Sequence, residues 1–214
     1  VIPLHNEQVR LRETIFNVVC YCEHNLHARY EILLVENGST DQTLRIAQEL
    51  DRTYRPVYAF HIDERSKAQA VRYGMLKAVG EYRYMCDCDL SAPIDELTKF
   101  LKLSRDGWDI VIGSREHADS EVRTSAKRWF IGRTFQLLTH FYTGLDYTDT
   151  QCGFKLFNAH AAMDIFGRSQ CHSMAFDVEV LHLVQVMGYT LKELAVPWVA
   201  NDDSRVRLWG DSFE

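Results

Sequence analysis

The fold of this chain is decided by residues 84–93, whose sequence is YMCDCDLSAP. An apolar segment ends here in two carboxylates one residue apart, and the apolar spacing of residues 94–104 then predicts a helix. Residues i and i+2 of an extended segment point the same way, so Asp87 and Asp89 are expected to converge just beyond a strand. In an open α/β sheet, ligands bind at that edge.

Two interpretations of this stretch are open. Asp87 and Asp89 offer hard oxygen ligands, which suit Mg²⁺ or Mn²⁺ completed by substrate phosphates and water. Alternatively, the stretch is a solvated turn in which Asp87 or Ser91 caps the following helix. Asp-x-Asp alone favours the cap, but the pattern of the rest of the chain reverses that preference.

The composition is that of an ordinary globular protein. The 214 residues are 46% hydrophobic and 25% charged, and a net charge of −6 without a long basic run disfavours non-specific nucleic-acid binding. No segment reaches the roughly 18 uninterrupted apolar residues of a membrane-spanning helix. Because residues 1–4 resemble a strand already under way, we expect a fragment of a longer chain, and a membrane anchor elsewhere stays open.

Strand and helix patterns alternate along the chain, which predicts an α/β fold with a mainly parallel central sheet. Gly-x-Gly-x-x-Gly and Gly-Lys-Ser/Thr motifs are absent, which disfavours a dinucleotide dehydrogenase and a P-loop enzyme. Polar loops at 5–7, 36–41, 63–67, 87–91 and 113–116 are expected at one sheet edge. We expect strands at 1–4, 30–35, 57–62, 82–86, 108–112 and 190–196, a turn into a short strand within 149–157, and helices at 8–26, 42–50, 66–79, 94–104, 125–143, 159–166 and 176–187.

Seven stretches carry a resemblance to a known family: residues 1–7, 35–41, 87–91, 113–115, 149–157, 176–179 and 193–198. In this order they resemble the family 2 glycosyltransferases of the GT-A fold. The resemblance is to the branch of dolichyl-phosphate glucosyltransferase and dolichol-phosphate mannose synthase, for which DTQCGFKLF at 149–157 is the most specific stretch. Two departures stand out: Glu36-Asn37 replace a pair of Asp, and the loop 65–70 lacks the family's glycines.

The resemblance implies a Rossmann-like GT-A architecture in a single domain, 1–214. Residues 1–116 would form the nucleotide-sugar-binding half and residues 117–214 the acceptor-binding half. Around 113–124 the linker is too short to separate two independent domains.

The donor site implied by the resemblance binds a nucleotide diphosphate sugar. Glu36 would accept hydrogen bonds from a base N–H or a ribose hydroxyl, a role that its place at a strand end favours over that of a mere turn carboxylate. Asp87 would hold the ribose or the metal, and Asp89 the Mg²⁺ or Mn²⁺ that bridges the diphosphate. The base and ribose pocket would be lined by Pro3, Leu4 and Glu7, and Lys67 and Arg72 would contact the base or diphosphate unless they are solvated helix charges.

The acceptor implied by the resemblance is a polyprenyl phosphate. A phosphomonoester has a second pKa near ~6, so it is largely anionic at neutral pH and needs cations more than a strong base. Arg115 and Arg128 are the first candidates, because guanidinium matches phosphate bidentately. Arg133 and Lys155 are further candidates, and a solvated helix face is the alternative for Arg128 and Arg133.

Asp149 is the candidate carboxylate near the reacting centre, where it would orient the acceptor or act as base. Its alternative role is to cap the next turn. Of Asp177 and Glu179, one is expected to face the site and the other to be structural. Gly153 is expected to supply a backbone conformation that other residues resist.

We therefore expect an inverting, metal-dependent hexosyltransferase. It would use UDP-glucose, or GDP-mannose as the second choice, and a dolichyl or undecaprenyl phosphate acceptor at the cytoplasmic face of a membrane. The alternatives are a transferase that acts on a sugar hydroxyl or small molecule, and a non-catalytic nucleotide-sugar-binding protein. No nucleic-acid partner is expected, and the oligomeric state stays open.

Overall fold

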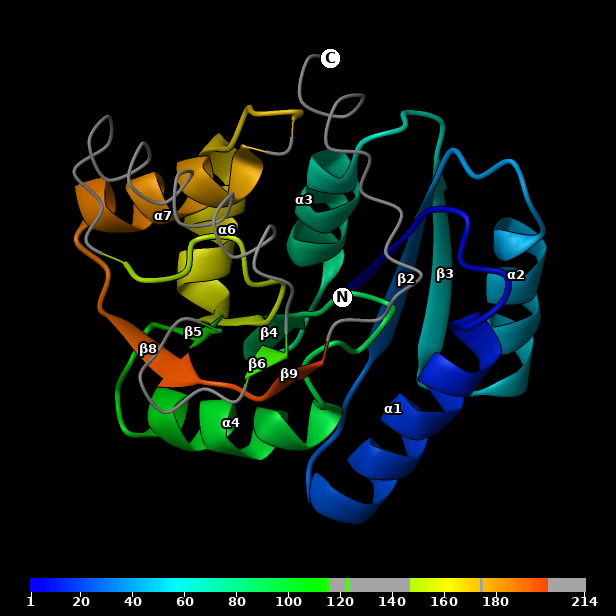
Figure 1. Ribbon diagram of the computed structural model, residues 1–214, viewed down its shortest axis with the longest axis horizontal. Helices are drawn as coiled ribbons and strands as arrows, with labels where there is room; N and C mark the ends of the chain where they lie inside the picture. Colours follow the sequence, from blue (N-terminus) through cyan, green and yellow to red (C-terminus); the bar gives the residue numbers. More distant parts are fainter. Residues whose placement is uncertain (116–121, 124–146, 174, 200–214) are drawn as a thin grey trace.

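The computed structural model describes residues 1–115, 122–123, 147–173 and 175–199 (Figure 1). The helix expected at 125–143 lies outside these residues, and so do Arg128 and Arg133.

The first half of the chain forms a parallel sheet in the order β1-β2-β3. In its register Leu4 lies opposite Glu36, and Glu36 lies opposite His61, so the last residues of the three strands share one edge. The elements are β1 (Ile2–Leu4), α1 (Leu11–Asn25), β2 (Ile32–Asn37), α2 (Thr43–Thr53), β3 (Val57–Ile62) and α3 (Lys67–Lys77).

The second half forms a mixed sheet in the order β4-β7-β5-β8. Strand β7 is antiparallel to both of its neighbours, whereas β5 and β8 are parallel. A separate parallel pair joins β6 (Val122–Arg123) and β9 (Trp198–Val199). The other elements are β4 (Tyr82–Met85), the 3₁₀ turn η1 (Ile94–Glu96), α4 (Leu97–Arg105), β5 (Ile110–Ser114), β7 (Lys155–Asn158), α6 (Ala159–Arg168), α7 (Phe176–Met187) and β8 (Leu191–Ala195).

Two hydrogen bonds join the sheets beside β1. The amino group of Val1 donates to the carbonyl of Tyr84 at 2.6 Å, and the N–H of Cys86 donates to the carbonyl of Val1 at 3.1 Å. Val1 thus bonds to the residues on either side of Met85, which is the hydrogen-bond pattern of two parallel strands. The expected α/β fold with a mainly parallel sheet is confirmed, and β7 is the antiparallel exception.

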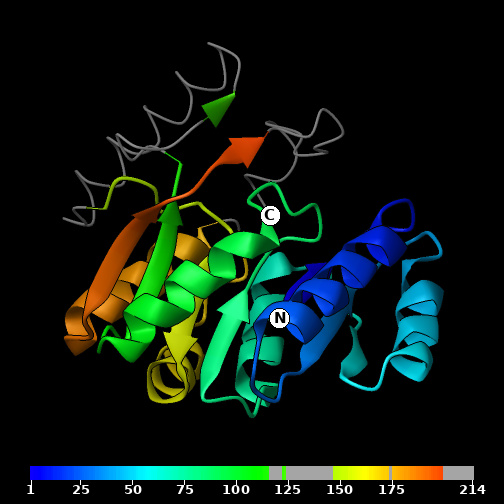
Figure 2. The same ribbon diagram turned by 90° about the horizontal axis from the view of Figure 1, so that it is seen from below.

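Helices cover both faces of the sheet (Figures 1 and 2). Val111 and Leu156 pack into the core beneath α1, α2 and α4, whereas Ile110, Ile112 and Phe157 pack into the core beneath α3, α6 and α7. This alternation along β5 and β7 follows from the two-residue period of a strand. A sheet covered on both faces leaves its strand-end edge as the place for polar chemistry.

The expected first helix begins later than its sequence pattern indicates. Residues 8–10 form a turn in which the carbonyl of Glu7 accepts from the N–H groups of Arg10 and Leu11, and α1 starts at Leu11. Val9, which fits the apolar spacing, is exposed. The reason is that residues 5–8 are held against the loop after β2, with Asn6 N–H donating to Ser39 Oγ at 3.0 Å.

Three rings anchor the core below the strand-end edge. Phe100 on α4 is 0% exposed and makes edge-to-face contacts with Tyr84 and Phe154, at centroid distances of 6.0 and 5.9 Å. Phe154 follows the turn at 149–153 and contacts Tyr84 at 4.8 Å. Phe154 is therefore a core residue.

We predict that Phe100→Ala lowers the free energy of unfolding by about 3–5 kcal/mol, because it leaves a cavity under the strand-end edge. The same change at Phe16, whose exposure is 54%, is the matched control and should cost about 0.5 kcal/mol or less. Urea unfolding measures both values. Equal losses in the two variants would contradict the assignment of Phe100 to the core.

Candidate functional site

Asp87 and Asp89 lie just beyond β4, on the opposite side of the chain from Cys88. Both carboxylates are part-exposed, whereas Cys88 is buried and its carbonyl accepts from Thr14 Oγ1 at 2.7 Å. Leu90 has a φ of 45°, a left-handed conformation that is uncommon for a branched residue and clusters at functional sites. Residues 87–90 form a turn in which the N–H of Leu90 donates to the carbonyl of Asp87 at 3.2 Å, so the backbone here is not extended, and the convergence of the two carboxylates stays a prediction.

The interpretation in which Asp87 or Ser91 caps the following helix is wrong: the N-cap positions of η1 and α4 are Pro93 and Glu96, and neither makes a side-chain capping bond. Asp89 Oδ1 accepts the N–H of Ser91 at 3.0 Å, so this carboxylate closes the turn that precedes η1. Closing a turn does not by itself exclude metal binding, because a carboxylate has about four acceptor positions.

Lys67 supplies the counter-charge for Asp87. It is the first residue of α3, and its Nζ lies 2.5 Å from Asp87 Oδ1. Burial by itself would raise the pKa of Asp87, but the positive charge of Lys67 outweighs burial and lowers that pKa. The pKa of Lys67 is raised, because Asp87 and Asp177 outweigh the opposing effect of burial. Both groups are therefore held charged.

Gly153 lies against the carboxylate of Asp87. A Cβ atom at this position would be 2.7 Å from the carboxyl carbon of Asp87 and closer still to Oδ2. Gly153 is not among the described glycines with positive φ, so the expectation of a special backbone conformation is wrong. The glycine is needed because the 149–153 turn approaches Asp87 too closely for any side chain.

Arg115 and Asp149 form a bidentate ion pair at the end of β5. Asp149 Oδ2 accepts from Arg115 Nε at 2.7 Å and from its backbone N–H at 3.0 Å, and Oδ1 accepts from Nη2 at 2.9 Å. Burial opposes the charge of Asp149, but the bonds to Arg115 outweigh burial and lower its pKa. Oδ1 also accepts from the N–H of Gln151 at 3.1 Å, as the turn-capping interpretation predicted.

Glu193 on β8 fixes the same turn, a role that the sequence did not indicate. Its Oε1 accepts from the N–H and the hydroxyl of Thr148 at 2.9 and 2.8 Å, and from the N–H of Asp149 at 3.3 Å. The structure thus brings Asp87, Asp149 and Arg115 to one edge. In the sequence, Glu193 belongs to the stretch 193–198 that carries the family resemblance, but no functional role was expected for that stretch.

Lys155 does not reach an acceptor site, and its expected role as an acceptor ligand is wrong for this structure. Its side chain is 0% exposed, and its ammonium group contacts Asp177 Oδ1 and the carbonyl of Cys152, each at 2.5 Å. A buried ammonium needs such partners because burial of an unpaired charge is costly. Lys155 instead holds the 149–153 turn from below.

Asp177 and Glu179 are both structural, so the expectation that one faces the site is not met. Asp177 is buried against Lys155. Glu179 accepts hydrogen bonds from Ser169 Oγ and from the N–H groups of residues 170 and 171, at 2.7–2.9 Å. The two carboxylates begin α7 and tie its first turn to the segments beside it.

Pro3 and Leu4, which were expected to line the base and ribose pocket, have buried side chains. Both are buried in β1, and Leu4 is 0% exposed, because β1 lies between β2 and β4 with helices on both faces. Glu7, which follows the strand, is half-buried, with Oε2 at 3.1 Å from Arg10 Nε. Of these three expected donor-site residues, Glu7 alone is partly accessible.

Glu36 is also a supporting residue here. It is 1% exposed, its Oε1 accepts from the N–H of Ser39, and its Oε2 accepts from His61 Nδ1 at 2.5 Å. His61 Nε2 lies 3.0 Å from Asp63 Oδ1. The bond to Glu36 raises the pKa of His61. Sequence reasoning assigned His61 nothing, because only the strand register shows that it faces Glu36.

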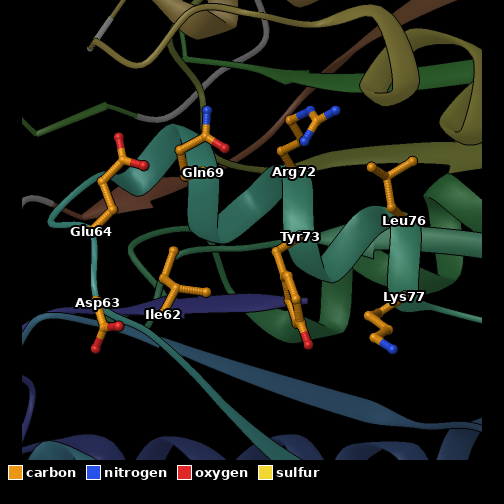
Figure 3. Close-up of a pocket in the computed structure, with 8 residues that line it drawn as sticks. All are labelled: Ile62, Asp63, Glu64, Gln69, Arg72, Tyr73, Leu76 and Lys77. Carbon is orange, nitrogen blue, oxygen red and sulfur yellow. The ribbon is translucent and has the colours of Figure 1, made fainter.

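Arg72 is separated from Lys67. It lines a shallow pocket of about 350 Å³ between the end of β3 and α3 (Figure 3). Its Nε is buried and makes no hydrogen bond within the described part of the chain. The pocket is lined by Ile62, Asp63, Glu64, Gln69, Arg72, Tyr73, Leu76 and Lys77.

The donor set at the edge fits a divalent cation that is shared with a substrate. Within the described ranges, no group of three or more His, Cys, Asp or Glu side chains could hold a metal. Asp87 and Asp89 together offer two hard ligands, and Mg²⁺ is commonly bound by one or two carboxylates plus substrate phosphates.

Among the described residues, no helix has the length and apolar character to cross a bilayer.

Comparison with known proteins agrees with the fold. The family model Glycosyl transferase family 2 matches residues 1–166. Mouse dolichyl-phosphate beta-glucosyltransferase is 32% identical over 98% of this chain and 69% of its own length. The Saccharomyces cerevisiae protein of the same name is 29% identical, over 100% of this chain and 70% of its own length.

Among solved structures, the chain is similar to glucosyl-3-phosphoglycerate synthase from Mycobacterium tuberculosis in complex with UDP. The TM-score is 0.67 at 14% identity, over 96% of this chain and 72% of that chain. This likeness confirms the GT-A fold that the resemblance implied.

We predict that Gly153→Ala lowers the free energy of unfolding by about 1–3 kcal/mol, because the added methyl group overlaps the carboxylate of Asp87. Gly167→Ala in α6 is the matched control: nothing lies within 4 Å of its added Cβ, and alanine favours a helix. Urea unfolding compares the variants, and a crystal structure of Gly153→Ala should show Asp87 displaced from Lys67. Equal stability of the two variants would contradict this packing.

Proposed function

The chain belongs to glycosyl transferase family 2, and from this premise we propose that it transfers glucose from UDP-glucose to a polyprenyl phosphate, with inversion at the anomeric carbon. The observation that carries the proposal is the convergence of Asp87 and the Arg115–Asp149 pair on the 149–153 turn. Relatives named dolichyl-phosphate beta-glucosyltransferases support both the sugar and the acceptor. GDP-mannose is the second choice of donor.

Asp87 and Asp89 would hold Mg²⁺ or Mn²⁺ against the diphosphate of the donor. Structures with the same fold are described in complex with Mn²⁺ and UDP, and with Mg²⁺ and UDP, which supports this assignment. A bound divalent cation acts as a Lewis acid on the departing nucleoside diphosphate. Lys67 holds Asp87 in its charged form and adds a cation beside the diphosphate.

Arg115 would dock the acceptor phosphate. Asp149 fixes the guanidinium by two side-chain bonds, and a guanidinium matches the geometry of a phosphate bidentately. Arg128 and Arg133 stay proposed as additional phosphate ligands, and Lys155 is no longer proposed.

The state of Asp149 favours a phosphate acceptor over a sugar hydroxyl. A hydroxyl acceptor requires a general base whose pKa lies near the working pH. Asp149 is paired, buried and has a lowered pKa, which makes it a weak base. An acceptor that is already anionic has no such requirement, so we assign Asp149 to the positioning of Arg115.

A polyprenyl acceptor implies work at a membrane surface. We propose that the protein acts peripheral to, or anchored at, the cytoplasmic face of the membrane. Residues 1–116 would bind the nucleotide sugar, and residues 117–214 would bind the acceptor. An acceptor assay with and without lipid vesicles tests this location.

We predict that Asp89→Ala reduces metal-dependent glucosyl transfer by about 100-fold or more while the protein stays folded, because the cation loses a ligand. Asp106→Ala, an exposed aspartate at the far end of α4, should retain wild-type transfer. Transfer from radiolabelled UDP-glucose to dolichyl phosphate is measured over a range of Mn²⁺ concentrations. Full activity of Asp89→Ala would remove the proposed metal site.

We further predict that Arg115→Ala reduces transfer to polyprenyl phosphate more than it reduces hydrolysis of the donor, by about tenfold, since it removes an acceptor ligand. Arg115→Lys keeps a charge for Asp149 and tests whether the bidentate geometry matters. Both activities are measured on the same preparation. Parallel loss of transfer and hydrolysis would mean that Arg115 serves the donor or the fold instead.

A further inference from the structure

The end of β3 carries an arrangement that the proposed function does not use. Glu36 and His61 are opposite each other in the register of β2 and β3, and Glu36 Oε2 accepts from His61 Nδ1 at 2.5 Å. Glu36 is 1% exposed, whereas the His61 side chain is 42% exposed. At this edge the carboxylate is thus buried behind the imidazole.

The hydrogen bonds fix which atoms of His61 carry protons. Glu36 is an acceptor, so Nδ1 must donate to it. Nε2 lies 3.0 Å from Asp63 Oδ1, another acceptor, so Nε2 also carries a proton. The raised pKa of His61 agrees with a doubly protonated ring. His61 therefore directs one N–H inward, to Glu36, and one outward.

The outward bond is easily exchanged. The side chain of Asp63 is fully exposed, and an exposed ion pair contributes little because water competes for both groups. A ligand oxygen can replace Asp63 as the acceptor of Nε2–H when the bound ligand excludes water from this hydrogen bond.

We propose that His61, and not Glu36, contacts the nucleotide base, and that its outward N–H selects a base whose edge presents a carbonyl oxygen. This inference rests on the proposed function, which puts a nucleotide at this edge. It reverses the direction of the hydrogen bond expected from the sequence. There, Glu36 accepts a hydrogen bond from the base, whereas here His61 donates one to the base. At C4, uracil presents a carbonyl oxygen where cytosine presents an amino group. An N–H group of His61 directed at this position therefore favours uracil over cytosine.

Calorimetric titration with UDP and CDP in the presence of Mg²⁺ tests the proposal. Wild type should bind UDP about tenfold more tightly than CDP, and His61→Leu should lose most of that ratio through weaker UDP binding. His24→Leu, on the exposed surface of α1, is the matched control and should keep the wild-type ratio. A ratio that His61→Leu leaves unchanged overturns the proposal.

His61→Leu leaves the buried Glu36 without its partner and could prevent folding, so a second variant tests the proposal with His61 in place. Asp63→Asn replaces the charged competitor for Nε2–H by a neutral and weaker acceptor, so it should raise the ratio of UDP to CDP affinity by about two- to threefold. Glu64→Gln, the neighbouring exposed carboxylate, controls for the general effect of charge, which acts on both nucleotides alike. Equal ratios in Asp63→Asn and Glu64→Gln overturn the proposal.

The outcomes also separate this inference from the function on which it rests. If wild type binds neither nucleotide, both the proposed function and the role of His61 are wrong. If wild type binds UDP and transfers glucose but shows no preference over CDP, the role of His61 alone is wrong.

Discussion

The close approach of the 149–153 turn to Asp87 is the constraint on which the rest of the site depends. Gly153 leaves no room for a side chain there, and Lys67 meets the same carboxylate from α3. One carboxylate thus joins the end of β4, the start of α3 and the segment before β7. Because the turn also carries Asp149, its position sets where the guanidinium of Arg115 can lie.

Buried charges beneath this edge occur in pairs, as the cost of burying an isolated charge requires. Lys155 is paired with Asp177, and Glu36 is bonded to His61. These pairs separate two kinds of polar residue that look alike in a sequence. Those that hold the turns and strands are buried, and those that we propose for metal and substrate binding, Asp87, Asp89 and Arg115, are part-exposed at the rim.

A family's motif therefore identifies a segment, whereas the structure decides which of its side chains is exposed. At the end of β2 the sequence places a carboxylate where the nucleotide is expected, yet Glu36 is covered. Its longer side chain, compared with the family's Asp, reaches the N–H of Ser39 and the ring of His61. Glu36 and His61 thus form one structural feature, spread over two strands.

The sequence by itself determined the α/β class, the strand ends that carry the polar loops, and the Asp87–Asp89 pair, because the periods of helices and strands depend on local geometry. Only the tertiary structure decided that β7 is antiparallel, that Gly153 is needed for space, and that Lys155 is buried. These properties depend on which strands and turns become neighbours across more than sixty residues of chain, as β4 and β7 do. Spacing along the chain carries no information about that distance in space.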